Sequence, residues 1–470
     1  MTLTQRLLFG ALSGVLLAAA FPPYHLPYFL PLAVAALLKA LDGATLRQGF
    51  YIGVLCSGIH LGATLFWLSN IFASAVAPLC AILALFPILF CTLYPSLVRG
   101  KGQGWVRVIA TSLWVGLEFF RAEPFVLNFG WPTLGYAVAG RPVFAPLAAL
   151  FGVYGISFLV FFLGTLKGRA LIIATTLWAI ACLVRLPAPS PERPLTVTLV
   201  QATDEETLFQ LSSRLPSSHP KGSLLGGRAG VGGPDIILWP EHAFHSDPRV
   251  AGRLKFENYW PRLQALAKES NAYLIFGAHV SKGTGEKDFE NAAFVLKPNG
   301  ELAGIHTKNH PVHFITDGIA STTAKAIPTV LGRLGVPICF DNDYPEVDRK
   351  LVQDGAEVFL VPNMDPEEWG PVQHAQHSLL FAMRAMENGR WLARADVAGG
   401  TSAVAPNGVE LAHVKDGEPQ TLKVTVGRTH HRTLYSLGGW VFGPLCLFSG
   451  VGFLTQAFLA PRGRRRQNHP

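Results

Sequence analysis

The chain alternates between long apolar stretches and one segment of ordinary polar composition. Residues 1–185 are almost continuously apolar, residues 193–430 mix charged and apolar side chains, and residues 437–460 carry no charge. A helix needs about 20 mostly apolar residues to cross ~30 Å of hydrocarbon. The pattern therefore predicts a membrane bundle, then a soluble domain, and then one more membrane span.

Eight apolar runs are long enough, or nearly so, to be membrane helices. The predicted spans lie near residues 5–21, 26–41, 50–70, 74–97, 106–120, 145–166, 169–185 and 436–460. Seven of them form a transmembrane bundle over residues 1–185, and the last is a final helix over 436–460. Ala18-Ala19-Ala20 is similar to a signal-peptidase site, but further spans follow at once, which favours an uncleaved first helix.

Basic residues beside the spans predict the orientation of the bundle. With the N-terminus inside, the cytoplasmic loops collect Arg6, Lys39, Arg47, Arg99, Lys101, Arg107, Lys167 and Arg169. Only Arg121, Arg141 and Arg185 fall on the other side. An even number of spans returns the basic tail, residues 461–470, to the cytoplasm. The soluble domain is then expected to face outside.

The amino-acid composition supports the predicted membrane spans, and it also limits the kinds of molecule that the chain is expected to bind. Of the 470 residues, 50% are apolar and only 15% are charged, against roughly 25% charged in ordinary soluble proteins. The net charge of +8 owes much to the flanks of the spans, so it requires no nucleic-acid partner. The glycines of the loop at 211–234 do not follow a strand and lack a Gly-Lys-Ser/Thr, which argues against a phosphate cradle.

The soluble part alternates strands with helices. A proline-rich linker at 186–194 precedes it. Strand-like runs lie at 195–201, 235–239, 272–277 and 357–362, with a strand pair around 294–305 and helical stretches at 257–270, 345–354 and 371–389. This alternation predicts an α/β layered domain over residues 195–430.

Three segments of this domain each end an apolar strand with a reactive group. They are Trp239-Pro240-Glu241, His306-Thr307-Lys308-Asn309 and Ile338-Cys339-Phe340. Cys339 is the only cysteine of the soluble part, so it has no disulfide partner there. A nearby carboxylate could take the proton of the thiol, and an ammonium could stabilise the negative oxygen of a tetrahedral adduct.

The order of these motifs resembles the Glu–Lys–Cys triad of the nitrilase, or carbon–nitrogen hydrolase, superfamily, whose fold is an αββα sandwich. With the apolar bundle and the final span, the whole chain resembles the apolipoprotein N-acyltransferase family. Further matching motifs are Phe21-Pro22-Pro23, Gly49-Phe50, Phe66-Trp67, Phe129-Gly130-Trp131-Pro132, Gly152-Val153-Tyr154-Gly155-Ile156-Ser157-Phe158, Asn363, Trp369-Gly370, His374, His377, Arg384-Ala385, Glu387, Arg390 and Arg394.

The resemblance implies a function. Cys339 would take an acyl chain from a membrane phospholipid as a thioester and pass it to the N-terminal diacylglyceryl-cysteine of an apolipoprotein. Glu241 would be the general base and Lys308 the oxyanion stabiliser. The implied setting is the bacterial inner membrane, with a periplasmic catalytic domain, no cofactor and no metal, and we expect a monomer. The segment 121–145, with Trp131 and Tyr136, is a candidate arm that guides acyl chains.

The sequence departs from the family pattern around the lysine and the cysteine. The family's glutamate after the lysine is absent, and Asp317 is the one possible substitute. Phe340-Asp341 replaces the family's Tyr-Glu after the cysteine. With Trp239, the residues Asp317, Phe340 and Asp341 are therefore the candidate supporting residues.

Three functions remain open from the residues alone. They are lipoprotein N-acylation, hydrolysis of a soluble amide or nitrile by a membrane-anchored enzyme, and lipoprotein binding by a weakly active or inactive paralogue. A metal site built from His306, His310 and His313 with His374 and His377 is disfavoured, because Pro311 prevents a regular helix there. We expect His374 and His377 to pack on a helix or to line the rim of the site.

Overall fold

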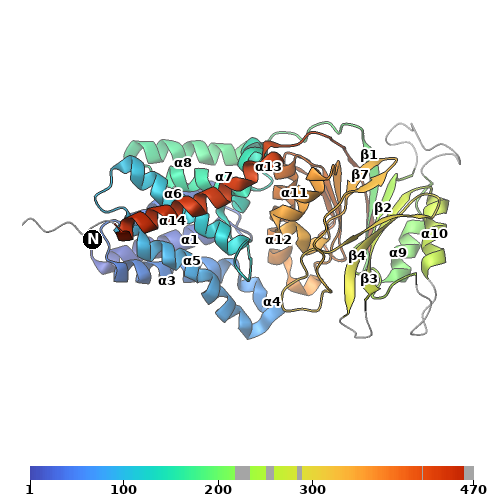
Figure 1. Ribbon diagram of the computed structural model, residues 1–470, viewed down its shortest axis with the longest axis horizontal. Helices are drawn as coiled ribbons and strands as arrows, with labels where there is room; N and C mark the ends of the chain where they lie inside the picture. The colour runs from blue at the N-terminus through green and yellow to red at the C-terminus, as the bar shows by residue number, and fades with distance from the viewer. Residues whose placement is uncertain (218–232, 250–258, 283–287, 415–416, 460–470) are drawn as a thin grey trace, which may run out of the picture.

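The computed structural model describes residues 1–217, 233–249, 259–282, 288–414 and 417–459. Its two parts lie end to end (Figure 1). The N-terminal helices and the C-terminal helix form one part, and two β-sheets with their covering helices form the other. The predicted basic tail at 461–470 lies outside the described residues.

Each of the eight predicted apolar segments is helical. The long helices are α1 (Leu3–Ala19), α2 (Leu30–Leu41), α3 (Leu46–Thr64), α5 (Val76–Leu97), α6 (Gln103–Ala122), α7 (Ala145–Gly164), α8 (Gly168–Leu183) and α14 (Phe442–Leu459). Within the described residues, three helical stretches are long and apolar enough to cross a membrane: Phe66–Leu97, Pro142–Gly164 and Gly439–Ala457. Shorter apolar helices cover Leu3–Ala19, Pro27–Leu41 and Gly168–Leu183.

Small residues let these helices approach closely. A Cβ at Gly49 of α3 would lie 2.3 Å from the carbonyl oxygen of Cys91 on α5. A Cβ at Gly116 of α6 would lie 2.6 Å from the Cα of Leu447 on α14. Since van der Waals packing drives helix association in apolar surroundings, Gly116 explains how the C-terminal helix docks on the N-terminal helices although more than 300 residues separate them in sequence.

The second part is a sandwich of two six-stranded sheets. One sheet has the strand order β12-β1-β2-β3-β4-β5, and the other β11-β10-β9-β8-β7-β6. The first contains β1 (Leu195–Gln201), β2 (Ile236–Leu238), β3 (Tyr273–Ser281), β4 (Phe289–Leu296), β5 (Leu302–Thr307) and β12 (Gln420–Val426). The second contains β6 (Ile327–Thr329), β7 (Gly332–Gly335), β8 (Val358–Pro362), β9 (Leu392–Ala395), β10 (Ser402–Val404) and β11 (Glu410–His413).

Helices cover the outer face of each sheet (Figure 1). The first sheet is covered by α9 (Glu205–Ser213) and α10 (Tyr259–Ser270), and the second by α11 (Pro345–Gln353) and α12 (Pro371–Asn388). Strand alternation builds the two apolar layers, because Ile236 and Leu238 face the partner sheet while Ile237 faces the helices. This is the αββα sandwich that the sequence predicts.

The predicted elements differ from the observed ones mainly at their ends. The strand expected at 272–277 continues to Ser281, and α9 reaches Ser213 inside the region expected to be a loop. The remainder of that loop, residues 218–232, and the start of the helix expected at 257–270 lie outside the described residues.

The α11/α12 layer joins the sandwich to the helical part. On α12, Glu387 accepts a hydrogen bond from the backbone N–H of Val153 at 2.8 Å, at a kink in α7 where Gly152 has a φ of 68°. The same carboxylate pairs with Arg384 at 3.1 Å, the ion pair expected from their spacing. The second sheet is thus fixed to the helices through α12.

Candidate active site

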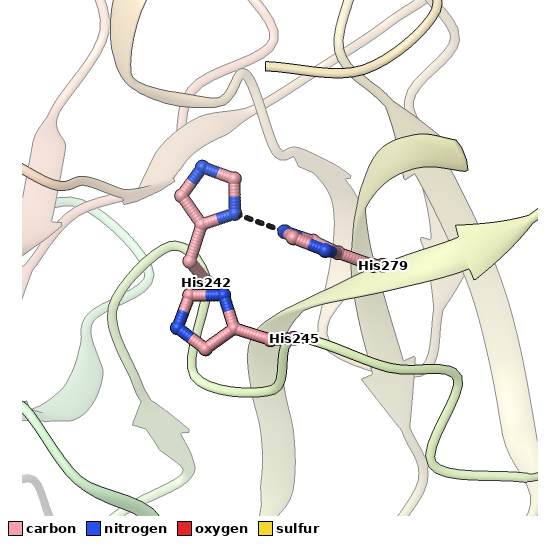
Figure 2. A group of neighbouring side chains, drawn as sticks. All are labelled: His242, His245 and His279. Carbon is pink, nitrogen blue, oxygen red and sulfur yellow. Dashed lines mark hydrogen bonds between the residues drawn. The ribbon is translucent and has the colours of Figure 1, made fainter. Parts of the chain in front are cut away.

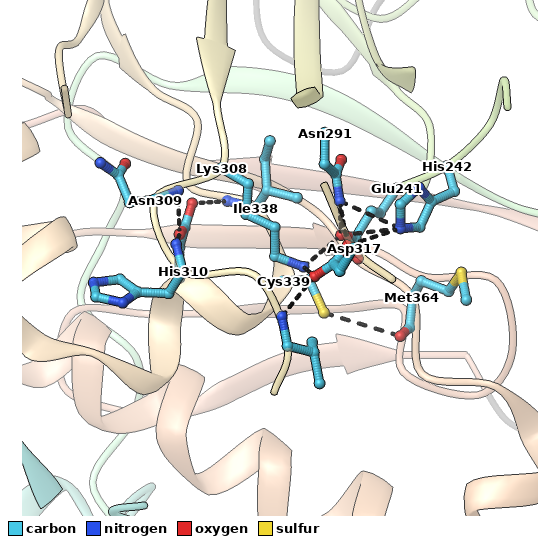
Figure 3. A network of polar contacts seen from close by, with 12 residues as sticks. Glu241, His242, Asn291, Lys308, Asn309, His310, Asp317, Ile338, Cys339 and Met364 are labelled. Carbon is cyan, nitrogen blue, oxygen red and sulfur yellow. Dashed lines mark hydrogen bonds and ion pairs between the residues drawn. The ribbon is translucent and has the colours of Figure 1, made fainter. Parts of the chain in front are cut away.

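The three predicted reactive groups come from three strand ends. Glu241 follows β2, Lys308 follows β5, and Cys339 follows β7 after a short extended segment. Two backbone hydrogen bonds set the positions of the first two groups. The N–H of Glu241 donates to the carbonyl of Asn363 in the opposite sheet at 3.2 Å, and the N–H of Lys308 donates to the carbonyl of Asn291 on β4 at 2.8 Å. The site therefore lies where both sheets end (Figure 3).

Lys308 lies between two buried carboxylates. Its Nζ donates to Oε1 of Glu241 at 2.7 Å and to Oδ2 of Asp317 at 2.6 Å. Burial lowers the pKa of Lys308, but the two carboxylates outweigh burial and raise this pKa well above its ordinary value. Burial raises the pKa of Asp317, and the Lys308 ammonium outweighs it, so the pKa of Asp317 is held below its usual range. Lys308 is thus a fixed cation at neutral pH.

Asn291 joins the two carboxylates on their other side. From the middle of β4, its Nδ2 donates to Oε1 of Glu241 at 2.6 Å and to Oδ1 of Asp317 at 2.8 Å. The carboxylates of Glu241 and Asp317 therefore share two donors, Lys308 and Asn291. Asp317 does contact the lysine, as expected of a substitute for the missing glutamate. Asn291 was not anticipated, because nothing in a strand interior marks such a residue before the strand register is known.

Cys339 begins a short 3-10 helix, Cys339–Asp343, with a φ of 44°. A non-glycine residue in this region costs energy and is often found at functional sites. The sulfur is buried and points toward the carbonyl oxygen of Met364 at 3.9 Å. Burial raises the pKa of Cys339, Glu241 raises it further, and Lys308 lowers it, so the pKa stays well above its ordinary value. The resting group is a thiol, which needs a base when it reacts.

Asp341 fixes the turn that carries the cysteine. Its Oδ1 accepts the backbone N–H of Asn309 at 2.8 Å and that of His310 at 2.9 Å. Its Oδ2 accepts the N–H of Ile338 at 3.1 Å and lies 3.3 Å from Nε2 of His306. This buried carboxylate therefore joins the segment after Lys308 to the segment around Cys339.

The two aromatic candidates have different surroundings. Phe340 lies beside the cysteine and packs edge-on against Tyr344, with ring centroids 5.3 Å apart. Trp239 is fully buried under the helices of the first sheet, where its indole N–H donates to Ser212 at 2.9 Å. Its ring packs edge-on against Phe209. The placement gives Trp239 a role in the core.

An apolar cavity opens on Cys339 from the side of the helical part. Its walls combine residues before α7 with residues from the loops and from α12 of the sandwich. The lining side chains are those of Trp67, Leu68, Ile71, Phe72, Leu79, Leu127, Phe129, Trp131, Val312, His313, Phe314, Cys339, Phe340, Trp369, Gln373 and His377. At its rim, Phe72 and Phe314 approach edge-on with ring centroids 6.0 Å apart, and Phe314 is 73% exposed. The thiol is therefore reached through apolar surroundings.

His377 is buried on α12, and its side chain lines this cavity. Its Nδ1 lies 2.8 Å from Asp365 and its Nε2 3.1 Å from Asp343, and its ring stacks on Trp131. Burial lowers the pKa of His377, but Asp365 and Asp343 outweigh it and raise the pKa to about 9. Trp131 thus joins the helical part to the sandwich. Tyr136, the other residue of the expected arm, is instead buried and accepts a hydrogen bond from Arg384 at 2.9 Å.

The histidines considered for a metal site have separate protein partners. His306 contacts Asp341, His310 lies 3.2 Å from Glu346, and His313 lies 2.7 Å from Asn128. A different group, His242, His245 and His279, is brought together next to Glu241. No motif in the sequence marks these three histidines as a group.

The two parts of the chain match two family profiles. Residues 13–166 match the apolipoprotein N-acyltransferase N-terminal domain, and residues 220–433 match the carbon-nitrogen hydrolase family. The apolipoprotein N-acyltransferase of Geobacter metallireducens is 27% identical, over 98% of this chain and 96% of that protein. Over nearly its whole length the chain is therefore similar to apolipoprotein N-acyltransferases.

Other relatives carry the same name. The apolipoprotein N-acyltransferase of Photobacterium profundum is 26% identical, over 99% of this chain and 97% of that protein. Among solved structures, a carbon-nitrogen hydrolase from Helicobacter pylori G27 is 17% identical with a TM-score of 0.38, covering 56% of this chain and 98% of that one. These relatives confirm the resemblance found from the sequence. By their names, they are acyltransferases.

Proposed function

We propose that this chain N-acylates the N-terminal diacylglyceryl-cysteine of apolipoproteins, using a membrane phospholipid as acyl donor and a thioester on Cys339 as intermediate. The observation that carries the proposal is the position of the thiol. Cys339 lies near enough to Glu241 and Lys308 for their charges to shift its pKa (Figure 3), and it also lines an apolar cavity walled partly by the helical part. A reaction between two lipid substrates needs both the polar chemistry and the apolar entrance.

The first half-reaction forms the thioester. Glu241 accepts the proton of Cys339 as the sulfur attacks the ester carbonyl of the phospholipid. The fixed charge of Lys308 stabilises the oxyanion of the tetrahedral adduct. When the adduct collapses, the C–O bond breaks and the lysophospholipid alkoxide takes the proton from Glu241. The products are a lysophospholipid and the acyl-Cys339 thioester.

The second half-reaction transfers the acyl chain. The α-amino group of the acceptor cysteine attacks the thioester carbonyl and gives its proton to Glu241. The C–S bond then breaks, the sulfur recovers the proton, and an amide is released. Apolar walls around the thioester exclude water, which would otherwise hydrolyse the intermediate. Asp317 and Asn291 hold Lys308 and Glu241 in place during both steps.

We further propose that the chain lies in the bacterial inner membrane. All eight apolar helices span it, the N-terminus and basic loops lie in the cytoplasm, and the sandwich lies in the periplasm. Impermeant thiol labelling of intact spheroplasts tests this orientation. A cysteine at Lys282, on the sandwich, should react, and one at Lys101, between α5 and α6, should react only after lysis. The reverse pattern contradicts the orientation.

The apolar cavity also argues against a soluble amide as substrate, because such a molecule gains little from apolar walls.

The experiment that tests the proposed function is an acyl-transfer assay with purified full-length protein in detergent. The acceptor is a synthetic peptide with an N-terminal diacylglyceryl-cysteine, and the donor is a phospholipid labelled in its acyl chain. We expect the label in an amide at the peptide N-terminus.

Two matched controls make the assay decisive. The N-acetylated form of the peptide has no free amine and should accept no label. Cys80→Ala, which removes a helical thiol, should transfer as the wild type does, whereas Cys339→Ala should not. Release of ammonia from short amides without acyl transfer would favour the alternative of a membrane-anchored amidase. Binding of the peptide without acyl transfer would favour the alternative of an inactive paralogue that binds lipoproteins.

A further inference from the structure

Three histidines converge in the sandwich (Figure 2), and one of them, His242, lies beside Glu241 of the catalytic pair (Figure 3). His242 and His245 lie in the loop after β2, and His279 lies near the end of β3. One ring nitrogen from each can be chosen so that all three atoms lie within 4.8 Å of one another. Nδ1 of His242 and Nε2 of His279 are 2.6 Å apart. The three imidazoles thus face a common point.

The backbone fixes this arrangement. The N–H of Phe244 donates to the carbonyl of Gly277 at 3.2 Å, and the N–H of His279 donates to the carbonyl of Phe244 at 3.1 Å. These bonds attach the loop alongside β3, as an isolated parallel bridge between Phe244 and Ala278. His279 is held further by stacking on Phe289, with ring centroids 4.0 Å apart.

His242 has an unusual backbone conformation and an oriented ring. Its φ is 51°, a left-handed value that costs energy for a non-glycine residue. Its Nε2 lies 3.2 Å from Oδ1 of Asp317. A proton on Nε2 therefore donates to the carboxylate and leaves the lone pair of Nδ1 directed toward His279, with which Nδ1 forms a hydrogen bond in this structure (Figure 2). Metal-binding histidines generally have such a carboxylate partner on the nitrogen away from the metal.

We propose that His242, His245 and His279 bind one Zn²⁺ next to the catalytic pair. Zinc takes imidazole nitrogens at about 2.0–2.1 Å in tetrahedral geometry, which puts ligand atoms roughly 3.3 Å apart. The Nδ1–Nε2 separation of His242 and His279, 2.6 Å, is shorter than that value, and the three ligand atoms all lie within 4.8 Å of one another. His245 is exposed, so its ring can rotate to complete the set and solvent reaches the site. A water would take the fourth position.

The proposed site adjoins the acyl-transfer site through the contact of His242 with Asp317, but its test does not depend on activity. The untagged full-length protein is stripped with a chelator and dialysed against radioactive zinc chloride in detergent. We expect about one Zn²⁺ per chain, unaffected by excess Mg²⁺, which prefers oxygen ligands. X-ray absorption of the zinc-loaded protein should show histidine nitrogens as the main ligands.

Variants assign the ligands. His245→Ala and His279→Ala should each lose stoichiometric zinc, and His245→Cys, which offers another zinc ligand at an exposed position, should restore it. Asp317→Asn should weaken binding about 10-fold or more, as expected for a partner of a ligating histidine. His430→Ala removes a histidine whose side chain is 70% exposed, and it should bind as the wild type does.

Three results would overturn the proposal. The first is a wild-type protein that retains no zinc after dialysis. The second is full zinc binding by both His245→Ala and His279→Ala. The third is loss of zinc in Cys339→Ala, which would show that the thiol, and not the histidine cluster, holds the ion.

Discussion

Oδ1 of Asp341 accepts the backbone N–H of Asn309 at 2.8 Å across 32 residues of sequence. Asn309 follows the lysine of the site and Asp341 lies two residues after the cysteine. This hydrogen bond therefore joins the two segments whose separation decides whether Lys308 reaches an adduct on Cys339. Asp341 thus positions both groups.

Asp341→Asn should loosen this junction. The four groups around the carboxylate include three backbone N–H donors, and an amide NH₂ would face at least one of them. Leaving such buried donors unpaired costs about 1–3 kcal/mol, so the midpoint of thermal unfolding should fall and acylation should slow. The control is Asp354→Asn, at a part-exposed ion pair with Arg333, which should cost less than about 1 kcal/mol. Equal effects for both would remove the special role of Asp341.

Glu241→Gln should abolish acylation of Cys339 without unfolding the protein. The amide keeps the shape of the side chain but cannot take the thiol proton, and general bases contribute about 10²–10⁴-fold to rate. The measurement is the rate of label transfer from phospholipid, with circular dichroism as the check on folding. Glu290→Gln on β4, which removes a surface partner of Lys282, should keep full activity. Wild-type rates for Glu241→Gln would exclude it as the base.

His377 should make stability depend on alkaline pH. Its ring faces Asp343, Asp365, Trp131 and Phe381. Its pKa is raised from 6.5 to about 9, so its contribution is complete below pH 6.5 and is lost as the pH rises through 9. At ~1.4 kcal/mol per pKa unit the loss is about 3 kcal/mol.

The measurement is the thermal midpoint of the wild type and of His377→Asn between pH 6 and 10, a range set by that pKa shift. The wild-type midpoint should fall toward alkaline pH, and the variant should show a much flatter profile. His430→Asn serves as a control and should follow the wild type. Parallel profiles for wild type and His377→Asn would show that His377 is not the titrating group.

Phe314→Ala should impair use of long acyl chains. The ring is exposed at the rim of the cavity and contacts Phe72 of the helical part, so little stability depends on it. We expect KM for long-chain donors to rise several-fold, and KM for short-chain donors to rise less. Val330→Ala, at an exposed turn between β6 and β7, should change neither value. Equal effects on long and short donors would mean that the ring does not guide the chain.

Much of the sandwich follows from the sequence because strand periodicity is local. The strand expected at 195–201 is β1 with the same bounds. Its alternating β-branched residues are buried because apolar layers cover both faces of the sheet. Glu241 and Lys308 follow from the same logic, because they come soon after the ends of β2 and β5, whereas β7 ends at Gly335, four residues before Cys339. Trp239 shows the limit of this reasoning. It continues the alternation of β2 toward the helix layer with Ile237, whereas Glu241 lies past the strand end.

What the sequence could not reveal depends on contacts between distant segments. His242 and His279 are 37 residues apart, and only the bridge between Phe244 and Ala278 brings them together. Asn291 reaches Glu241 and Asp317 only through the register of β4 against β3 and β5. Tyr136 lies among apolar residues in the sequence and was expected to be part of an arm. Its hydroxyl instead accepts a hydrogen bond from Arg384, which lies on a helix almost 250 residues later.

The most direct test of the central claim is the mass of the peptide that contains Cys339 after incubation with a phospholipid of defined acyl chain and no acceptor. If Cys339 carries the thioester, the mass of this peptide should increase by one acyl group. Neutral hydroxylamine should remove the acyl group, and so should addition of the diacylglyceryl-cysteine peptide. Glu241→Gln should carry no such adduct. An unmodified Cys339 in a protein that still acylates the peptide would contradict the thioester mechanism.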